Sequence, residues 1–143
     1  MTNDHPKNST IRKPCIQPPS GTYSYDGILA EYWWKEGILY AILNNRKRTL
    51  ELQKANFDFV REFTKNQPVC ILVDATLIKV DDKESRDYTA LEMPKLYKAM
   101  AVMSASPFGR FIFNVFLRLK KPSIPTRLFT SEEEARKWLE RYI

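Results

Sequence analysis

The sequence is poor in the residues on which most enzyme active sites depend. It holds one histidine and four glycines among 143 residues. The histidine, His5, lies in a polar start, so the chain offers no Ser-His or Cys-His pair to activate a nucleophile. None of the glycines is spaced as GxGxxG or GxxxxGK, which argues against nucleotide-dependent enzymes. We therefore predict that the protein is not an enzyme and needs no cofactor.

Cysteine and long apolar runs are equally scarce. Cys15 and Cys70 are too few for a disulfide framework, which fits a reducing compartment. No apolar run approaches the roughly 20 residues of a membrane-spanning helix. The start MTNDHPKNST also lacks the hydrophobic stretch of a signal peptide. We expect a cytoplasmic protein without a membrane span.

Positive charge exceeds negative charge but is not concentrated. The net charge is +6, and the cations are spread along the chain. A balance of this size suits nucleic acid, anionic lipid or an acidic protein partner. Nucleic-acid-binding proteins usually gather their charge on one face or one helix, so we expect a protein partner or a small anionic ligand rather than nucleic acid.

The hydrophobic pattern predicts a single α/β domain over residues 23–143. Residues 1–22 contain four prolines and show no periodicity, so we predict a disordered tail there. Strands are expected within 28–34, 38–43, 69–76, 99–104 and 125–130, and helices within 49–67, 83–98, 107–119 and 131–142. This order, ββαβαβαβα, implies a mainly parallel central sheet of about five strands with helices packed on it. Pro94 predicts a break or kink in the second helix.

The predicted helix from Phe108 to Leu119 is unusually apolar. Its apolar side chains recur at helical spacing, and Phe113 and Leu117 extend them over more than half of the helix surface. A helix of this kind must be covered. We favour ordinary core packing; the alternatives are a pocket for a lipid-like ligand under residues 108–119, or a homodimer surface.

Function in a sheet of this kind belongs at the carboxyl ends of the strands, where helix N-termini present free N–H groups. The candidate residues at this edge, for a protein partner or a small anion, are Arg46, Lys47, Arg48, Asp74, Asp81, Ser85 and Ser106. The three adjacent cations can hold a phosphate or an acidic partner, although a plain solvated loop has the same composition. The aspartates match no metal-binding loop, so we predict helix capping by Asp81 or Asp82 and no metal.

Three segments of the chain share a pattern with a known family. They are the strand VCILVDAT with the loop and helix after it, the strand AMAVMS leading into SPFGRFIFNVFL, and the ending PTRLFTSEEEARKWL. With the order of the elements, they cover about residues 28–143 and resemble the STAS group, the domain of bacterial anti-sigma-factor antagonists, particularly its divergent single-domain relatives. The resemblance implies a regulatory module whose phosphorylatable serine follows an aspartate. The nearest counterpart here is Asp81, Asp82 and Ser85, with a lysine and a glutamate in between.

Three hypotheses for function follow. The first is a non-enzymatic regulatory or interaction module that binds a protein partner or small anionic ligand at the loop edge of the sheet. The second is a carrier of an apolar ligand, which needs a cavity under the 108–119 helix lined by Phe111, Val115 and Phe116. The third is a carboxylate-based enzyme, which needs carboxylates such as Asp74 and Asp82 to converge in a cleft.

Overall fold

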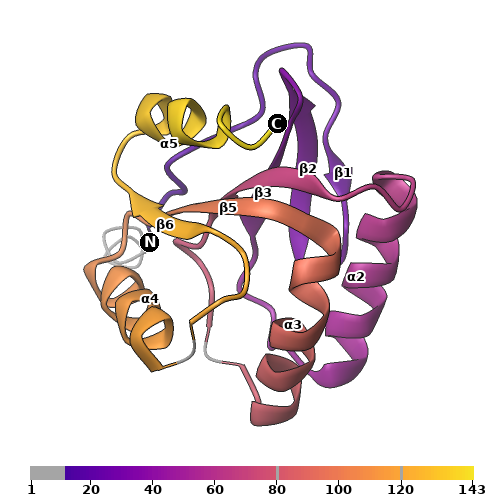
Figure 1. Cartoon of the computed structure of the whole chain (residues 1–143), viewed down its shortest axis with the longest axis vertical. Coiled ribbons are helices and arrows are strands. Elements are labelled where there is room, and N and C mark those ends of the chain that lie inside the picture. The colour runs from indigo at the N-terminus through magenta and orange to yellow at the C-terminus, as the bar shows by residue number, and fades with distance from the viewer. Residues whose placement is uncertain (1–11, 80, 120) are drawn as a thin grey trace, which may run out of the picture.

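The computed structural model of the chain describes residues 12–79, 81–119 and 121–143, and its centre is a six-stranded sheet (Figure 1). The strands are β1 Tyr25–Asp26, β2 Ala30–Lys35, β3 Ile38–Leu43, β4 Val69–Asp74, β5 Tyr97–Met103 and β6 Thr126–Phe129. They lie in sequence order across the sheet. The pairs β1–β2 and β2–β3 are antiparallel, and every later pair is parallel. The predicted mixed α/β fold is confirmed, with β1 as an additional edge strand.

The helices cover the two faces of this sheet unequally. They are α2 Leu50–Phe63, α3 Lys83–Leu96, α4 Pro107–Leu119 and α5 Glu132–Leu139. α2 and α3 pack against each other over one face, and α5 packs on β4, β5 and β6 over the other. α4 lies apart from the α2–α3 pair (Figure 1). Within the described ranges, no helix is long and apolar enough to cross a membrane.

Side-chain alternation along the strands produces two apolar cores. In β4, Ile71 and Val73 face α2 and α3, whereas Cys70 and Leu72 face α5. A strand that is covered on both faces needs an apolar residue at nearly every position, which explains the unbroken run in this segment.

Local signals end and begin these elements where the sequence predicts. Gly37 adopts φ +82° in the turn between β2 and β3, a conformation that glycine accepts without strain. Ser131 caps α5 by accepting a hydrogen bond from the Glu134 amide at 3.3 Å. α3, in contrast, continues through Pro94 to Leu96. A proline in the last turn of a helix removes a single backbone hydrogen bond, so no break follows.

Residues 12–22 differ from the predicted disordered tail. Ile16 is buried in the core on the α5 side of the sheet. The backbone amides of Cys15 and Ile16 both donate to the carboxylate of Asp74 at the end of β4. These contacts fix the described part of the segment to the domain, because one side chain fills core space and two amides find a buried acceptor. Residues 1–11 lie outside the described residues.

Candidate functional site

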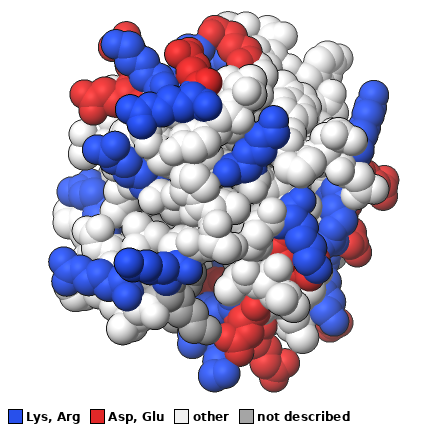
Figure 2. Space-filling model, in the orientation of Figure 1, with Lys and Arg blue, Asp and Glu red and all other residues white. Residues whose placement is uncertain are grey.

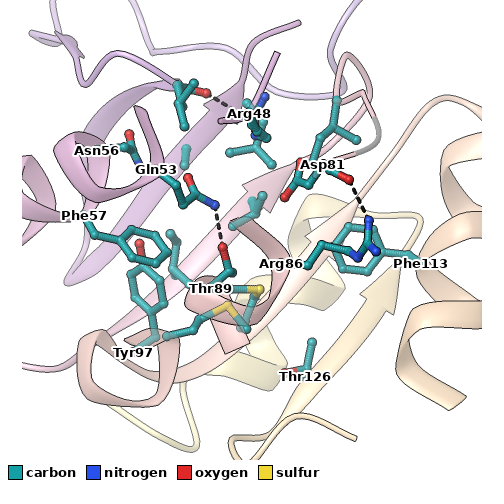
Figure 3. A pocket seen from close by; sticks show the side chains of 18 of the residues that line it. Arg48, Gln53, Asn56, Phe57, Asp81, Arg86, Thr89, Tyr97, Phe113 and Thr126 are labelled. Atoms are coloured by element: carbon teal, nitrogen blue, oxygen red, sulfur yellow. Dashed lines mark hydrogen bonds between the residues drawn. The ribbon is translucent and has the colours of Figure 1, made fainter. Parts of the chain in front are cut away.

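A cavity of about 460 Å³ lies between one face of the sheet and the helices α2, α3 and α4 (Figure 3). Its apolar walls come from Tyr32, Ala41, Ile71, Val73 and Met100 of the sheet and from Phe57, Met93, Phe108, Ile112 and Phe113 of the helices. Protein interiors are normally packed to the density of organic crystals. A space of this size on the core side of the sheet is therefore the most conspicuous feature of the fold.

α4 closes the outer side of this cavity. Gly109, Ile112 and Phe113 line it from consecutive turns of the helix. The Ser106 hydroxyl accepts a hydrogen bond from the Gly109 amide at 3.1 Å, so Ser106 caps the helix. A Cβ atom at Gly109 would lie only 2.8 Å from the Ser104 hydroxyl. Glycine therefore lets α4 begin close to the end of β5.

Most polar groups at the cavity are already paired. Gln53 of α2 donates through Nε2 to the Thr89 hydroxyl of α3 at 2.6 Å (Figure 3). The Tyr32 hydroxyl donates to Asn56 Oδ1 at 3.2 Å. Burial raises the pKa of Tyr32 to about 12, so its proton stays in place at neutral pH. These bonds hold α2 against α3 and the sheet, and they shape the cavity without filling it.

Arg48 is a buried residue of the cavity wall, not a surface cation. Only 3% of the residue is exposed to solvent. Nη1 donates to the carbonyls of Asn44 and Arg46 at 2.9 and 3.2 Å, and Nη2 donates to the carbonyl of Leu29 at 2.7 Å. Burial lowers the pKa of Arg48, and the field of Asp81 opposes that shift. The prediction that Arg48 is part of an exposed basic loop is wrong, because three carbonyls hold the guanidinium inside.

Asp81 places an unpaired oxygen at the same cavity. The residue lies just before α3 and lines the cavity (Figure 3). Its Oδ1 is buried and has no hydrogen-bond partner among the described residues. Burial raises the pKa of Asp81 to about 6, while the charges of Arg48 and Arg86 act in the opposite direction. Arg86 itself donates to the backbone carbonyl of Asp81 at 2.6 Å, not to its carboxylate.

Ser85 lies in the first turn of α3 and is fully buried. Its hydroxyl also lacks a hydrogen-bond partner within the described part of the chain. A kinase needs an exposed hydroxyl in an accessible segment, which the folded domain does not present at Ser85. The start of α3 therefore carries two buried oxygens without partners, one on Asp81 and one on Ser85.

Asp74 belongs to a different place in the fold. Its Oδ2 accepts from the amides of Cys15 and Ile16, and its Oδ1 accepts from the Thr76 amide at 2.9 Å. Because Leu72 faces α5, Asp74 two residues later also faces that side, away from the cavity. Both oxygens are taken by backbone donors, so Asp74 anchors the N-terminal segment.

The loop edge expected from the sequence is therefore divided. Arg48 and Asp81 both line the cavity, Ser85 is buried in the first turn of α3, Ser106 caps α4, and Asp74 is on the opposite face. Arg46 and Lys47 are exposed, and Arg46 also donates to the carbonyl of Ile28 at 3.2 Å.

Sequence reasoning missed Gln53 and Asn56 as cavity residues. Both are buried in α2 together with Phe57 and Val60. The four positions follow the i, i+3, i+4, i+7 spacing of one helix face. Two amides on an otherwise apolar face were the available signal that this side of the helix borders something other than ordinary core.

No group of three or more His, Cys, Asp or Glu side chains that could hold a metal ion occurs in the described ranges. Asp81, Asp82 and Asp74 do not form such a group, since Asp74 is engaged on the other face. Among the described residues, the charged side chains that line the cavity are those of Arg48, Lys79, Asp81 and Arg86.

Comparison with solved structures confirms the predicted STAS-like fold. The chain is similar to an uncharacterised protein of the DUF3478 family from Shewanella loihica PV-4, which has a SpoIIAA-like fold. The TM-score is 0.56 at 16% sequence identity, and the match covers 84% of this chain and 98% of that one. A comparison with curated proteins gives no match. A family model matches residues 32–143, and the chain accordingly belongs to the family described as Domain of unknown function (DUF7793).

Proposed function

We propose that the domain is a non-enzymatic binding module that holds a small, mainly apolar molecule in the cavity under α4. One observation carries this proposal: a 460 Å³ space with apolar walls contains a buried carboxylate oxygen that has no partner in the described chain. Small-molecule sites typically have volumes of about 300 to 1,000 Å³, apolar walls and a few polar groups that fix orientation. The cavity has each of these properties.

Physical chemistry favours an occupant for this space. An empty apolar cavity leaves its wall atoms without dispersion contacts on one side. An unpaired buried oxygen adds a cost of about 1 to 3 kcal/mol. A molecule with an apolar body and one hydrogen-bond donor would remove both costs, with its donor at Asp81 and its body against Ile112 and Phe113. The ligand class is therefore an apolar molecule with a single polar end.

Cavity filling tests the proposal. Thr126→Trp places the largest side chain in the cavity wall, while Thr130→Trp makes the same change at an exposed position just after β6. We expect the wild type to bind the neutral fluorophore N-phenyl-1-naphthylamine saturably with one site per chain. Thr126→Trp should weaken this binding by at least about tenfold, and Thr130→Trp should leave it unchanged.

Two outcomes would contradict the proposal. Non-saturable binding of the fluorophore would show that it reports only general surface. Equal affinities in the two tryptophan variants would place the binding site elsewhere. Native mass spectrometry of the protein purified from its own cells provides an independent check, since a retained small-molecule mass that Thr126→Trp eliminates would identify the physiological occupant.

A second proposal is an interaction module for a protein partner or small anion. Its support is narrower than the sequence suggests, because only Arg46 and Lys47 of the basic loop are exposed. The test is the double reversal Arg46→Glu/Lys47→Glu, which should abolish capture of such a partner while the free energy of unfolding stays unchanged. Undiminished capture would remove these two residues from the interface.

A carboxylate-based enzyme has the least support. That hypothesis needs two carboxylates in one cleft, and Asp74, the first candidate, has both oxygens bound to backbone amides on the face away from the cavity. Asp82, the second candidate, is exposed. The non-enzymatic interpretation therefore stays our proposal.

A further inference from the structure

α4 is an apolar helix that the rest of the domain does not cover. Phe108, Phe111 and Leu119 are 65%, 61% and 79% exposed. No α4 side chain that the structure describes is fully buried. The sequence predicts that this helix must be covered, yet the described parts of the chain leave its outer side open.

Apolar residues form a stripe along one side of α4. Phe108, Phe111, Val115 and Leu119 follow at intervals of three and four; Phe108, Phe111 and Leu119 are exposed, and Val115 between them is half-buried. Ile112 lies beside the stripe, is 37% exposed, and also lines the cavity. Soluble monomers rarely expose contiguous apolar surface of this length without a use for it. The stripe is therefore a candidate binding surface.

The residues in and just after α4 include basic side chains but no acidic ones. Arg118 lies in the last turn of α4, and Lys121 follows the helix; both are exposed. The sequence contains no acidic residue between Glu92 and Glu132, a range that includes all of α4. In the space-filling view, Lys and Arg side chains lie beside uncharged surface in the region of α4, and the acidic side chains of this face lie elsewhere (Figure 2).

We propose that α4 is a membrane-surface helix that lays its apolar stripe into the interface of an anionic lipid bilayer. Helices that bind in this way combine Phe and Leu on one side with Lys and Arg beside them. Each cation near an anionic leaflet contributes favourably, and long basic side chains reach back to the headgroups. A second copy of the chain fits less well, because a symmetric contact through α4 would bring the same cations together.

This surface adjoins the proposed cavity and shares Phe108 with it, whereas Phe111, Val115 and Leu119 do not line the cavity. Phe108 and Ile112 line the cavity and are also exposed on the outer side of α4. A bilayer in contact with α4 would therefore lie directly beside the cavity wall. The membrane contact itself does not depend on an occupant in the cavity, so the two proposals can fail independently.

Vesicle co-sedimentation tests the inference. Vesicles of phosphatidylcholine with phosphatidylglycerol should bind the full-length wild type, and pure phosphatidylcholine vesicles should bind it much less. Phe111→Glu/Leu119→Glu, which changes no residue of the cavity wall, should lower binding by at least about tenfold. The matched control Leu91→Glu alters an equally exposed apolar residue, 66% exposed on α3, and should leave binding unchanged.

Two double variants with the same net charge test whether vesicle binding depends on the position of the cations or only on the total charge of the protein. Arg118→Glu/Lys121→Glu and Lys137→Glu/Arg141→Glu change the net charge equally, but the second pair lies on or after α5, over the other face of the sheet. Only the first should weaken vesicle binding, and added salt should reduce the difference.

Several results would overturn the inference. They are equal binding to neutral vesicles, an equal loss in the Leu91→Glu control, and a solution dimer that Phe111→Glu/Leu119→Glu dissociates without any vesicle binding by the wild type. Binding of N-phenyl-1-naphthylamine by Phe111→Glu/Leu119→Glu distinguishes the two proposals. Retained fluorophore binding with lost vesicle binding supports a membrane surface separate from the cavity, and loss of both would contradict that separation.

Discussion

The guanidinium of Arg48 donates a 2.7 Å hydrogen bond to the backbone carbonyl of Leu29. Leu29 precedes β2 and Arg48 precedes α2, so this bond connects two loops that the hairpin separates. Arg48 also binds the carbonyls of Asn44 and Arg46 within its own loop. A single side chain thus satisfies three backbone acceptors at the rim of the cavity, which makes it a structural residue.

Arg48→Met should destabilise the domain by about 2 to 4 kcal/mol, because it leaves buried carbonyls without donors. Arg46→Glu/Lys47→Glu alters the exposed neighbours and should change the free energy of unfolding by no more than about 0.5 kcal/mol. Urea unfolding followed by circular dichroism measures both. Similar small effects in the two variants would show that the carbonyls are satisfied without Arg48.

Asp74→Asn should loosen the N-terminal segment. An asparagine keeps one acceptor oxygen where the carboxylate uses two, so it cannot accept from the amides of Ile16 and Thr76 on separate oxygens. We expect faster hydrogen exchange at the Ile16 amide and a loss of about 1 to 3 kcal/mol in stability. Asp58→Asn, at an exposed carboxylate of α2, is the control. Unchanged exchange at Ile16 in Asp74→Asn would contradict the anchoring role.

Ser85→Ala should leave stability unchanged or raise it slightly, because the hydroxyl it removes has no partner in the described chain. Ser85→Glu places a charge at the same fully buried position and should cost more than about 2 kcal/mol. Ser20→Glu, at an exposed position, should cost little. Thermal unfolding compares the three. A tolerated Ser85→Glu would mean that the start of α3 opens readily enough to expose this serine.

The arrangement of strands and helices could be predicted because each element carries its own local signal. The run from Val69 to Asp74 is apolar at nearly every position, which only a strand covered on both faces requires. Ser131 precedes Glu134 at the spacing of a helix cap, and the structure shows that cap. Signals of this kind depend on residues that are close in the sequence, so they can be recognised without knowledge of the tertiary fold.

The candidate site was harder to predict because it depends on partners distant in sequence. Arg48 resembles Arg46 and Lys47 in the sequence, and what distinguishes it is its burial, which includes a hydrogen bond to the carbonyl of Leu29, 19 residues away. In the sequence, Asp74 looks like a free carboxylate. In the folded domain, it accepts a hydrogen bond from the backbone amide of Ile16. The cavity arises because α4 stands off from α2 and α3, a spacing that no periodicity encodes.

Asp81 should make stability depend on pH in a direction opposite to most carboxylates. Its pKa in the folded protein is about 6, above the value of about 3.9 for an unfolded aspartate, so the folded state binds the proton more tightly. The contribution of Asp81 to the free energy of unfolding is therefore fully present below about pH 4 and is lost as the pH rises through 6. Asp81→Asn cannot ionise and avoids this loss. Relative to the wild type, it should gain about 1 to 2 kcal/mol between pH 4 and pH 7, an amount reduced by the partial exposure of the side chain. Urea unfolding of both proteins at the two pH values measures this difference, and a difference that stays constant would show that Asp81 ionises as freely in the folded protein as in the unfolded chain.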